Sequence, residues 1–301
     1  MTNGVIVVNK PQNFTSFDVV AVMRGCYHTK KVGHSGTLDP MATGVLPVFI
    51  GSATKAVSIL PDSDKSYRAG FRLGITSDTL DIWGKCSGQR EVNVSESALQ
   101  DVLERFRGEI DQIPPMYSAL KVNGQKLCDL ARQGIEVERQ PRRITITRLE
   151  LLEFRRASSA GRASSADGMD GVIDVDCSSG TYIRALVDDI GRALGTGAVM
   201  TSLVRTRACG YGIDEAYPLS ELKTKPLDEL ESLLLPTESV FKDYPEIHLD
   251  EEQKRLYLNG VRLDANRLHN VPDGEMFRVY AEEFLGIAKI TADELISVKR
   301  F

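Results

Sequence analysis

The densest group of residues that could carry chemistry is a loop-like stretch, Gly33-His-Ser-Gly-Thr-Leu-Asp-Pro-Met-Ala-Thr-Gly44. Its carboxylate, Asp39, precedes Pro40, and a residue before proline is held in an extended backbone. Its three glycines allow another backbone or a ligand to approach closely, and loops of this kind often carry binding and catalytic residues. Asp39 is therefore our first candidate catalytic residue. The alternative is that its carboxylate only caps the turn at Pro40.

The common signatures of hydrolases, nucleotide-binding proteins and metalloenzymes are absent from the sequence. It contains no GxxxxGK[ST], GxGxxG, GxSxG or HExxH motif. The four histidines form no i,i+4 pair, and the five cysteines are scattered without a CxxC pair. This pattern favours reduced thiols over a zinc site or a disulfide framework. Hydrolase and nucleotide-cofactor chemistry therefore have no support in these motifs.

The elements that must position this loop combine both periodicities, which predicts an α+β fold. The 301 residues, 42% of them hydrophobic, can bury one large core and a small appended domain. The segment from Tyr67 to Leu73 alternates, with Arg68 and Arg72 on the face opposite Tyr67. Strands are predicted at 5–9, 45–50, 67–74, 144–154, 172–177 and 199–209, and helices at 16–27, 53–60, 95–106, 126–133 and 181–194.

The borders of these elements and of the domains have their own signals. Ser16, Ser95 and Asp250 are predicted N-caps. The Ala-, Ser- and Gly-rich segment 155–171 cannot contribute to a core and is expected to be a mobile surface loop. A boundary is predicted at 240–245, followed by a helix and three strands. No apolar stretch reaches the roughly 20 residues of a membrane helix, and the start of the chain does not read as a signal peptide, so we expect a cytoplasmic protein.

The charge distribution is compatible with a nucleic-acid ligand but does not demand one. The net charge of −5 argues mildly against such a ligand, although the position of the charges matters more than their sum. Arg142 and Arg143 lie in a basic cluster at 139–148, and Lys30 and Lys31 lie in another. We take Arg142 and Arg143 as candidate RNA-binding residues. The alternative is that these clusters are ordinary solvated faces.

The loop GHSGTLDPMATGVLPV closely resembles the signature of the TruB family of tRNA pseudouridine synthases. The resemblance covers about residues 4–215, weakens over the C-terminal 60 residues and fails in segment 155–171. Asn13 and Cys128 stand where family members usually carry glycine and tyrosine. Further segments match the family in the same order: Lys10-Pro11, Thr15-Ser16, Gly51-Ser-Ala-Thr-Lys55, Asp64-Lys-Ser-Tyr67, Pro114-Pro-Met-Tyr-Ser-Ala-Leu-Lys-Val-Asn-Gly124, Ser179-Gly-Thr-Tyr-Ile-Arg184, Asp188-Asp-Ile-Gly191 and Leu203-Val-Arg-Thr206.

The resemblance implies an architecture of two domains. The first, 1–240, is a pseudouridine synthase-type catalytic domain built on a mixed, mainly antiparallel sheet flanked by helices. It carries an RNA-gripping insertion at about 114–135 and the flexible insert 155–171. The second, 245–301, is a small PUA-like, β-rich domain that would bind RNA.

The resemblance also implies an activity, the isomerisation of uridine 55 in the TΨC loop of tRNA to pseudouridine, without metal or organic cofactor. Asp39 is then the catalytic aspartate, which could attack C1′, add to C6 or remove the C2′ proton. Arg184 is its expected partner and Tyr67 the aromatic ring that stacks on the extruded base. From spacing alone, Arg184 could instead pair with Asp188, and Tyr67 could simply pack on an apolar strand face.

The remaining site residues follow from the same resemblance. Tyr182 and Leu203 match residues that line the uracil pocket, and His34 matches one that lies near the flipped base. Lys10 and Lys55 are candidate RNA-binding residues. Ordinary core packing or solvation is the alternative for each. The expected partner is the T stem-loop of tRNA. The protein is expected to act as a monomer, with no obligate protein partner and no membrane association. Other possible functions are RNA binding or folding without catalysis, and pseudouridine formation in a different RNA.

Overall fold

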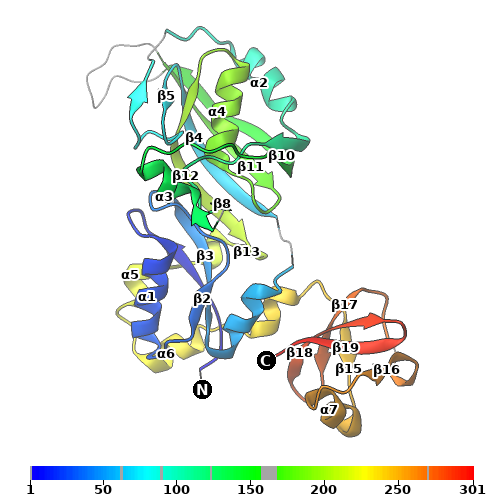
Figure 1. Cartoon of the computed structure of the whole chain (residues 1–301). Coiled ribbons are helices and arrows are strands. Elements are labelled where there is room, and N and C mark those ends of the chain that lie inside the picture. The colour runs from blue at the N-terminus through cyan, green and yellow to red at the C-terminus, as the bar shows by residue number, and fades with distance from the viewer. Residues whose placement is uncertain (1, 62–63, 89–90, 123, 157–167, 270) are drawn as a thin grey trace. The chain divides into compact units, whose positions relative to one another are not determined.

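The protein is described by a computed structural model that covers residues 2–61, 64–88, 91–122, 124–156, 168–269 and 271–301. The chain forms two compact units (Figure 1). The first unit comprises Met1–Pro40, Gly44–Pro61 and Cys209–Phe301, and the second comprises Met41–Thr43 and Asp62–Ala208. Both contain helices and mainly antiparallel strands, so the predicted α+β class is confirmed. Within the described residues, no helix is long and apolar enough to cross a membrane.

The first unit is built around a small sheet in the order β14-β1-β3, with β2 also paired to β3. Strand β1 is antiparallel to β3 and parallel to β14, and β2 is antiparallel to β3. The predicted strands at 5–9 and 45–50 are therefore confirmed. The bounds are β1 (Gly4–Lys10), β2 (Val32–His34), β3 (Thr43–Ile50) and β14 (Tyr217–Pro218).

Helix α1 (Ser16–Cys26) begins one residue away from its predicted cap. Thr15, not Ser16, is the N-cap: its hydroxyl accepts from the amide of Asp18, and the Asp18 carboxylate accepts from the amide of Thr15. This reciprocal pair is a capping box, which satisfies two of the amides left free at a helix start. The Ser16 hydroxyl is thereby available for a longer-range contact.

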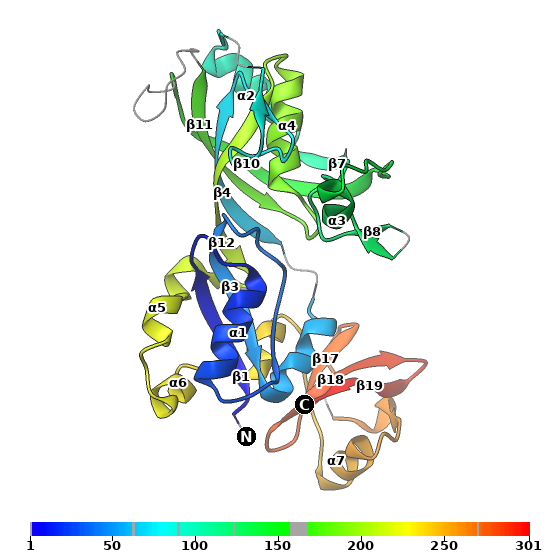
Figure 2. The ribbon, with the colours of Figure 1, turned by 60° about the vertical axis from the view of Figure 1, so that its left-hand side comes forward.

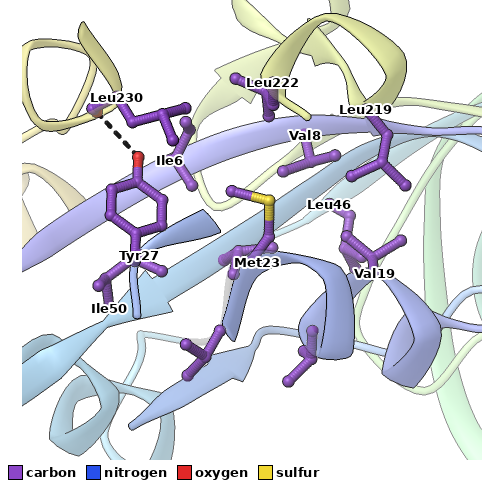
Figure 3. Close-up of a cluster of buried hydrophobic side chains, with 13 residues drawn as sticks. Ile6, Val8, Val19, Met23, Tyr27, Leu46, Ile50, Leu219, Leu222 and Leu230 are labelled. Atoms are coloured by element: carbon purple, nitrogen blue, oxygen red, sulfur yellow. Dashed lines mark hydrogen bonds between the residues drawn. The ribbon is translucent and has the colours of Figure 1, made fainter. Parts of the chain in front are cut away.

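A cluster of buried apolar side chains holds α1 on the sheet of the first unit (Figure 3). Met23 of α1 is fully buried in this cluster. The phenol of Tyr27, at the end of α1, donates a 2.9 Å hydrogen bond to the carbonyl of Leu230. Burial of this kind contributes about 1.5–3 kcal/mol for each large apolar side chain. The cluster includes Ile6, Val8, Val19, Leu46, Ile50, Leu219 and Leu222.

Short helical elements and the short strand β13 complete the first unit. The predicted helix at 53–60 is a 3₁₀ helix, η1, that begins and ends two residues earlier. The Leu-rich stretch at 219–240 forms short helical turns. The bounds are η1 (Gly51–Ser58), β13 (Tyr211–Gly212), η2 (Ile213–Glu215), α5 (Leu219–Leu222), α6 (Leu227–Ser232) and η3 (Thr237–Phe241).

The C-terminal part of the first unit has a sheet and a core of its own. Its strands follow the order β15-β17-β18-β19-β16, and its buried core includes Tyr257 and Phe277. Asp250 caps the helix, as predicted. This β-rich sheet agrees with the PUA-like fold expected here. The bounds are β15 (Glu246–His248), α7 (Glu251–Leu258), β16 (Leu263–Asp264), η4 (Ala265–Arg267), β17 (Met276–Tyr280), β18 (Phe284–Thr291) and β19 (Glu294–Arg300).

The second unit is an antiparallel sheet in the order β12-β4-β11-β10-β7. On β4 the predicted alternation is confirmed, because Tyr67 and every second residue after it are buried. On the other face, Arg68 and Arg72 form ion pairs with the cross-strand residues Asp174 and Asp170. The bounds are β4 (Lys65–Leu73), β7 (Gly108–Gln112), β10 (Arg142–Arg156), β11 (Met169–Cys177) and β12 (Ala198–Ala208).

Helices α2 (Glu96–Glu104) and α4 (Ile183–Ala193) lie side by side on this sheet (Figures 1 and 2). Ser95 caps α2, as predicted, by accepting from the amide of Ala98. Gly191 lets α4 approach the strand that follows it, because a Cβ at this position would lie 2.3 Å from the backbone nitrogen of Ala198. The glycine of the Asp188-Asp-Ile-Gly191 motif therefore serves close packing.

The structure corrects the borders of the predicted loop at 155–171. Strands β10 and β11 continue into this segment as a hairpin, with Arg155 paired to Asp170 and Arg156 paired to Met169. Asp170 accepts two hydrogen bonds from the Arg72 guanidinium, at 2.6 and 2.9 Å. The composition of the segment concealed these pairings, because they depend on partner strands. Residues 157–167 lie outside the described part.

The insertion expected at 114–135 contains a two-stranded hairpin and one short helix (Figure 2). Its elements are β8 (Lys121–Val122), β9 (Gln125–Lys126) and α3 (Leu127–Arg132). Cys128, one of the two departures from the family pattern, donates its backbone amide to the carbonyl of Ser118 at 3.1 Å. A further small hairpin, β5 (Thr76–Ser77) with β6 (Cys86–Ser87), precedes α2.

Candidate active site

The backbone on both sides of Asp39 is held by the residues that lead into α1. The Ser16 hydroxyl accepts from the amide of Leu38 at 2.9 Å and donates to its carbonyl at 3.4 Å. Ser16 and Leu38 are both buried. On the other side, the carbonyl of Pro40 accepts from the amide of Asn13 at 2.9 Å. The half-buried Asp39 thus sits between two anchored neighbours.

Lys10 is the third anchor of this loop. Its ammonium donates to the carbonyls of Pro11, Phe14 and Pro40 at 3.0, 2.6 and 3.1 Å, and the residue is 0% exposed. An ammonium has three hydrogens to donate, and these three carbonyls can take all of them. Such burial argues against the predicted direct contact with RNA. Lys10 instead ties the end of β1 and the start of α1 to the residue after Asp39.

Asn13 adopts the left-handed conformation that this turn requires. Its φ is 65°, a value that glycine reaches freely and that asparagine tolerates better than most residues. The departure from the family's glycine therefore preserves the turn, and the Asn13 amide still reaches the Pro40 carbonyl.

Arg184 is buried at the start of α4, with 5% of its surface exposed. Its guanidinium donates to the carbonyls of Thr79 and Tyr117, both at 2.9 Å, and lies 3.7 Å from a carboxylate oxygen of Asp81. These contacts fix the direction of the side chain. The alternative partner Asp188 pairs instead with Arg192 at 2.7 Å.

The other pocket residues predicted in the second unit lie on elements of this same sheet and helix. Tyr182 is the N-cap residue of α4, two positions before Arg184. Tyr67 on β4 and Leu203 on β12 occupy neighbouring strands and are 8% and 7% exposed. That low exposure also fits core packing, so their role in a uracil pocket stays a prediction. Asp39 belongs to the first unit, and its contact with Arg184 stays a prediction as well.

The predicted RNA-binding residues outside this core differ in their surroundings. Arg142 and Arg143 are both exposed, but Arg143 already pairs with Asp111 at 2.8 Å and with Glu109 at 3.3 Å. The exposed Lys55 donates to the carbonyl of Arg300 at 3.0 Å. His34, the last residue of β2, is half-buried. The basic cluster is therefore partly neutralised by acidic neighbours on β7.

Four side chains of this region have no role in the site that the sequence alone indicates. The sequence marks Ser16 only as a helix cap, and Asp81 and Gln112 carry no signal beyond their residue type. Arg205 lies within a family motif, directly opposite Tyr67 in the strand pairing, and is 0% exposed. A buried arginine in an alternating strand is unusual enough to mark a site. Among the described residues, no group of three or more His, Cys, Asp or Glu side chains could hold a metal ion.

Three family models match successive parts of the chain. They are described as the N-terminal domain of the TruB family pseudouridylate synthases (residues 24–183), the C-terminal domain of tRNA pseudouridylate synthase B (184–242), and the C-terminal region of pseudouridine synthase II TruB (245–301). They cover both the Asp39 loop and the start of α4.

Individual relatives match over nearly the whole length. A tRNA pseudouridine synthase B of Clostridium tetani is 41% identical over 99% of this chain and 99% of its own. The protein of the same name from Francisella philomiragia is 43% identical, over 99% and 95%. Among solved structures, one from a Cbf5-Nop10-Gar1 complex has a TM-score of 0.73 at 26% identity, and covers 100% of this chain and 84% of that one.

Proposed function

The chain belongs to the TruB family of pseudouridine synthases, and on that premise we propose that it converts uridine 55 in the T loop of tRNA to pseudouridine. The observation that carries the proposal is the anchored Asp39. Its two neighbours, Leu38 and Pro40, are held by hydrogen bonds: the amide of Leu38 donates to the Ser16 hydroxyl, and Asn13 and Lys10 donate to the carbonyl of Pro40. A carboxylate that only capped a turn would not need a frame of this kind, whereas a reacting group does.

The reaction exchanges one bond to C1′ of the ribose for another. The N1–C1′ bond breaks, the uracil turns, and a C5–C1′ bond forms; C5 then loses its proton and N1 gains one, so the product is an isomer. The Asp39 carboxylate could attack C1′, add to C6 or take the C2′ proton. Each route needs an ionised carboxylate beside the extruded base, and none needs a second substrate.

Arg184 would be the partner of the Asp39 carboxylate and fix its direction. The guanidinium of Arg184 is itself fixed by the carbonyls of Thr79 and Tyr117. Tyr67 would stack on the uracil and accept the C5 proton at the end of the reaction.

The substrate is a uridine of a folded loop, so it must leave its stack, at a cost of a few kcal/mol. Recognition of a stem-loop with splayed bases is the usual mode for RNA, and insertion 114–135 would grip it. The relatives named above are tRNA pseudouridine synthases, which supports tRNA as the substrate. We propose that the chain works as a monomer in the cytoplasm and needs no partner protein.

The test is incubation of the purified protein with an unmodified tRNA transcript, followed by mapping of pseudouridine at each position. We expect modification at position 55 by the wild-type protein. Asp39→Asn should abolish turnover, while the affinity for tRNA persists. Asp243→Asn changes an exposed carboxylate in the same way and should leave turnover unchanged.

Each other outcome would point to a different function. Pseudouridine at another position would indicate a different specificity. Tight tRNA binding without any pseudouridine would favour an RNA-binding or RNA-folding protein. Substantial turnover by Asp39→Asn would refute the assignment of the catalytic residue.

A further inference from the structure

The start of α4 lacks an ordinary helix cap. Its N-cap residue, Tyr182, makes no side-chain hydrogen bond to the first turn. Helix starts leave backbone amides without partners, and serine, threonine, aspartate or asparagine usually supply one. This particular start must nonetheless be well fixed, because it carries both Tyr182 and Arg184.

Gln112, on another element, holds this helix start by binding the backbone of Tyr182 itself. Its side-chain Oε1 accepts from the amide of Tyr182 at 2.8 Å, and its Nε2 donates to the carbonyl of Tyr182 at 3.1 Å. The primary amide thus pairs with both backbone polar groups of one residue. Gln112 is 2% exposed, so water cannot easily replace either bond.

Gln112 also lies where the insertion leaves the sheet. It is the last residue of β7 and pairs there with Arg142 of β10. Five residues later, the carbonyl of Tyr117 accepts from the Arg184 guanidinium. The chain at 112–117 is therefore bound at both ends to α4, once to the backbone of its N-cap and once to its arginine.

We propose that Gln112 is a positioning residue for Tyr182 and Arg184, and that its two-point pairing sets where the start of α4 stands relative to insertion 114–135. The inference rests on the proposed function, because the benefit of this placement is realised at the reacting uridine. Loss of the pairing would shift α4 by a fraction of its diameter. A misplacement of about 1 Å near a reacting centre can cost roughly 100-fold in rate.

Gln112→Glu is the decisive variant because protonation switches it. An ionised carboxylate can accept from the Tyr182 amide, but it presents a second acceptor to the Tyr182 carbonyl. A protonated carboxyl group has one O–H to donate and one oxygen to accept, which restores the pattern of the glutamine. Burial favours the neutral form of an introduced carboxyl group, so protonation should occur within the range in which the enzyme can be assayed.

The experiment measures kcat and KM for tRNA from pH 5.5 to pH 8.5, as the ratio of variant to wild type. The ratio cancels titrations that both proteins share, and the charged residues next to Gln112 in the strand pairing, Asp111 and Arg142, are the same in both proteins. We expect kcat of Gln112→Glu to fall about 10- to 100-fold at high pH, with KM little changed, and to rise toward the wild-type value as the pH is lowered. Gln100→Glu, the same change on the exposed face of α2, should give a ratio near one throughout.

A wild-type kcat for Gln112→Glu at high pH, or a deficit confined to KM, overturns the inference. A low kcat that does not recover at low pH also overturns it. If the glutamate variant does not fold, Gln112→Met replaces it, because methionine has a similar volume and carries no charge. Its kcat should be reduced at every pH, and an unchanged kcat overturns the proposal. Absence of pseudouridine 55 from the wild-type reaction would instead refute the proposed function.

Discussion

Replacing Lys10 with methionine separates two roles that the sequence left open for this residue. The methionine side chain has a similar length and is apolar, so it can occupy the same buried space. It cannot donate to the carbonyls of Pro11, Phe14 and Pro40. If Lys10 anchors the catalytic loop, stability and turnover should fall together. If Lys10 binds phosphate, RNA affinity should fall instead.

The size of the effect follows from these three bonds. A hydrogen bond to a charged group contributes roughly 1.5–3 kcal/mol. The summed contribution of three such bonds overstates the loss of stability. Folding of the wild-type protein must also dehydrate the buried ammonium, which costs several kcal/mol, and the methionine variant avoids this cost. We therefore expect the free energy of unfolding to fall by about 2–5 kcal/mol. With the carbonyl of Pro40 released, kcat should fall by about 100-fold.

Two measurements distinguish the roles. Hydrogen exchange at the Asn13 amide, which donates to the Pro40 carbonyl, should accelerate in Lys10→Met. The slope of log affinity for tRNA against log salt should stay at the wild-type value. Lys55→Met is the matched control, because Lys55 is exposed, and its loss should reduce that slope by about one if it contacts a phosphate. Wild-type stability with a reduced slope in Lys10→Met would refute our assignment.

Three further predictions concern the periphery of the site. Arg142→Glu should weaken tRNA binding in a filter-binding titration and reduce the salt slope of the affinity by about one. Arg143→Glu should weaken binding less, because Glu109 and Asp111 already pair with this arginine. Wild-type affinity in both variants would show that the cluster is not part of the RNA interface. Deletion of 157–167 should preserve the melting temperature and turnover, whereas a deletion reaching Asp170 should lower stability by removing its pair with Arg72. Burial raises the pKa of Asp189 to about 6, so the folded protein binds this proton more tightly than the unfolded chain, and stability should decline as the pH rises from about 4 to 6. Asp189→Asn should flatten that decline and raise the free energy of urea unfolding at pH 7 by about 1–3 kcal/mol. An unaltered pH profile of stability in the variant would contradict the raised pKa.

Local sequence signals predicted those features that depend on near neighbours. The alternation from Tyr67 to Leu73 placed the buried face of β4 correctly, because side chains alternate along any strand. Ser95 and Asp250 were recognised as caps because a capping side chain bonds to an amide three residues away. The same rule predicts Ser16 as the cap of α1, which is wrong by one residue, because Thr15 and Ser16 both carry a hydroxyl that fits the rule.

The family motifs predicted more than periodicity could. They named Asp39 and Arg184 as site residues while leaving open what holds either of them. The motifs do not show which side chains are exposed: Lys10, a candidate RNA-binding residue, is buried, and its contact with RNA stays a prediction. A lysine in a family motif can serve contacts within the protein or contacts with the ligand, and the residue type alone does not distinguish these two roles.

The sequence by itself determined the family, the α+β class, the longer strands and helices, and the loop that carries Asp39. Only the tertiary structure decided the partners that hold the site: Ser16 with Leu38, 22 residues apart, Gln112 with Tyr182, 70 apart, and Arg184 with Thr79, 105 apart. The physical reason is range. Periodicity and capping act within one or two turns of chain, whereas these hydrogen bonds form only after the core has brought distant segments within about 3 Å.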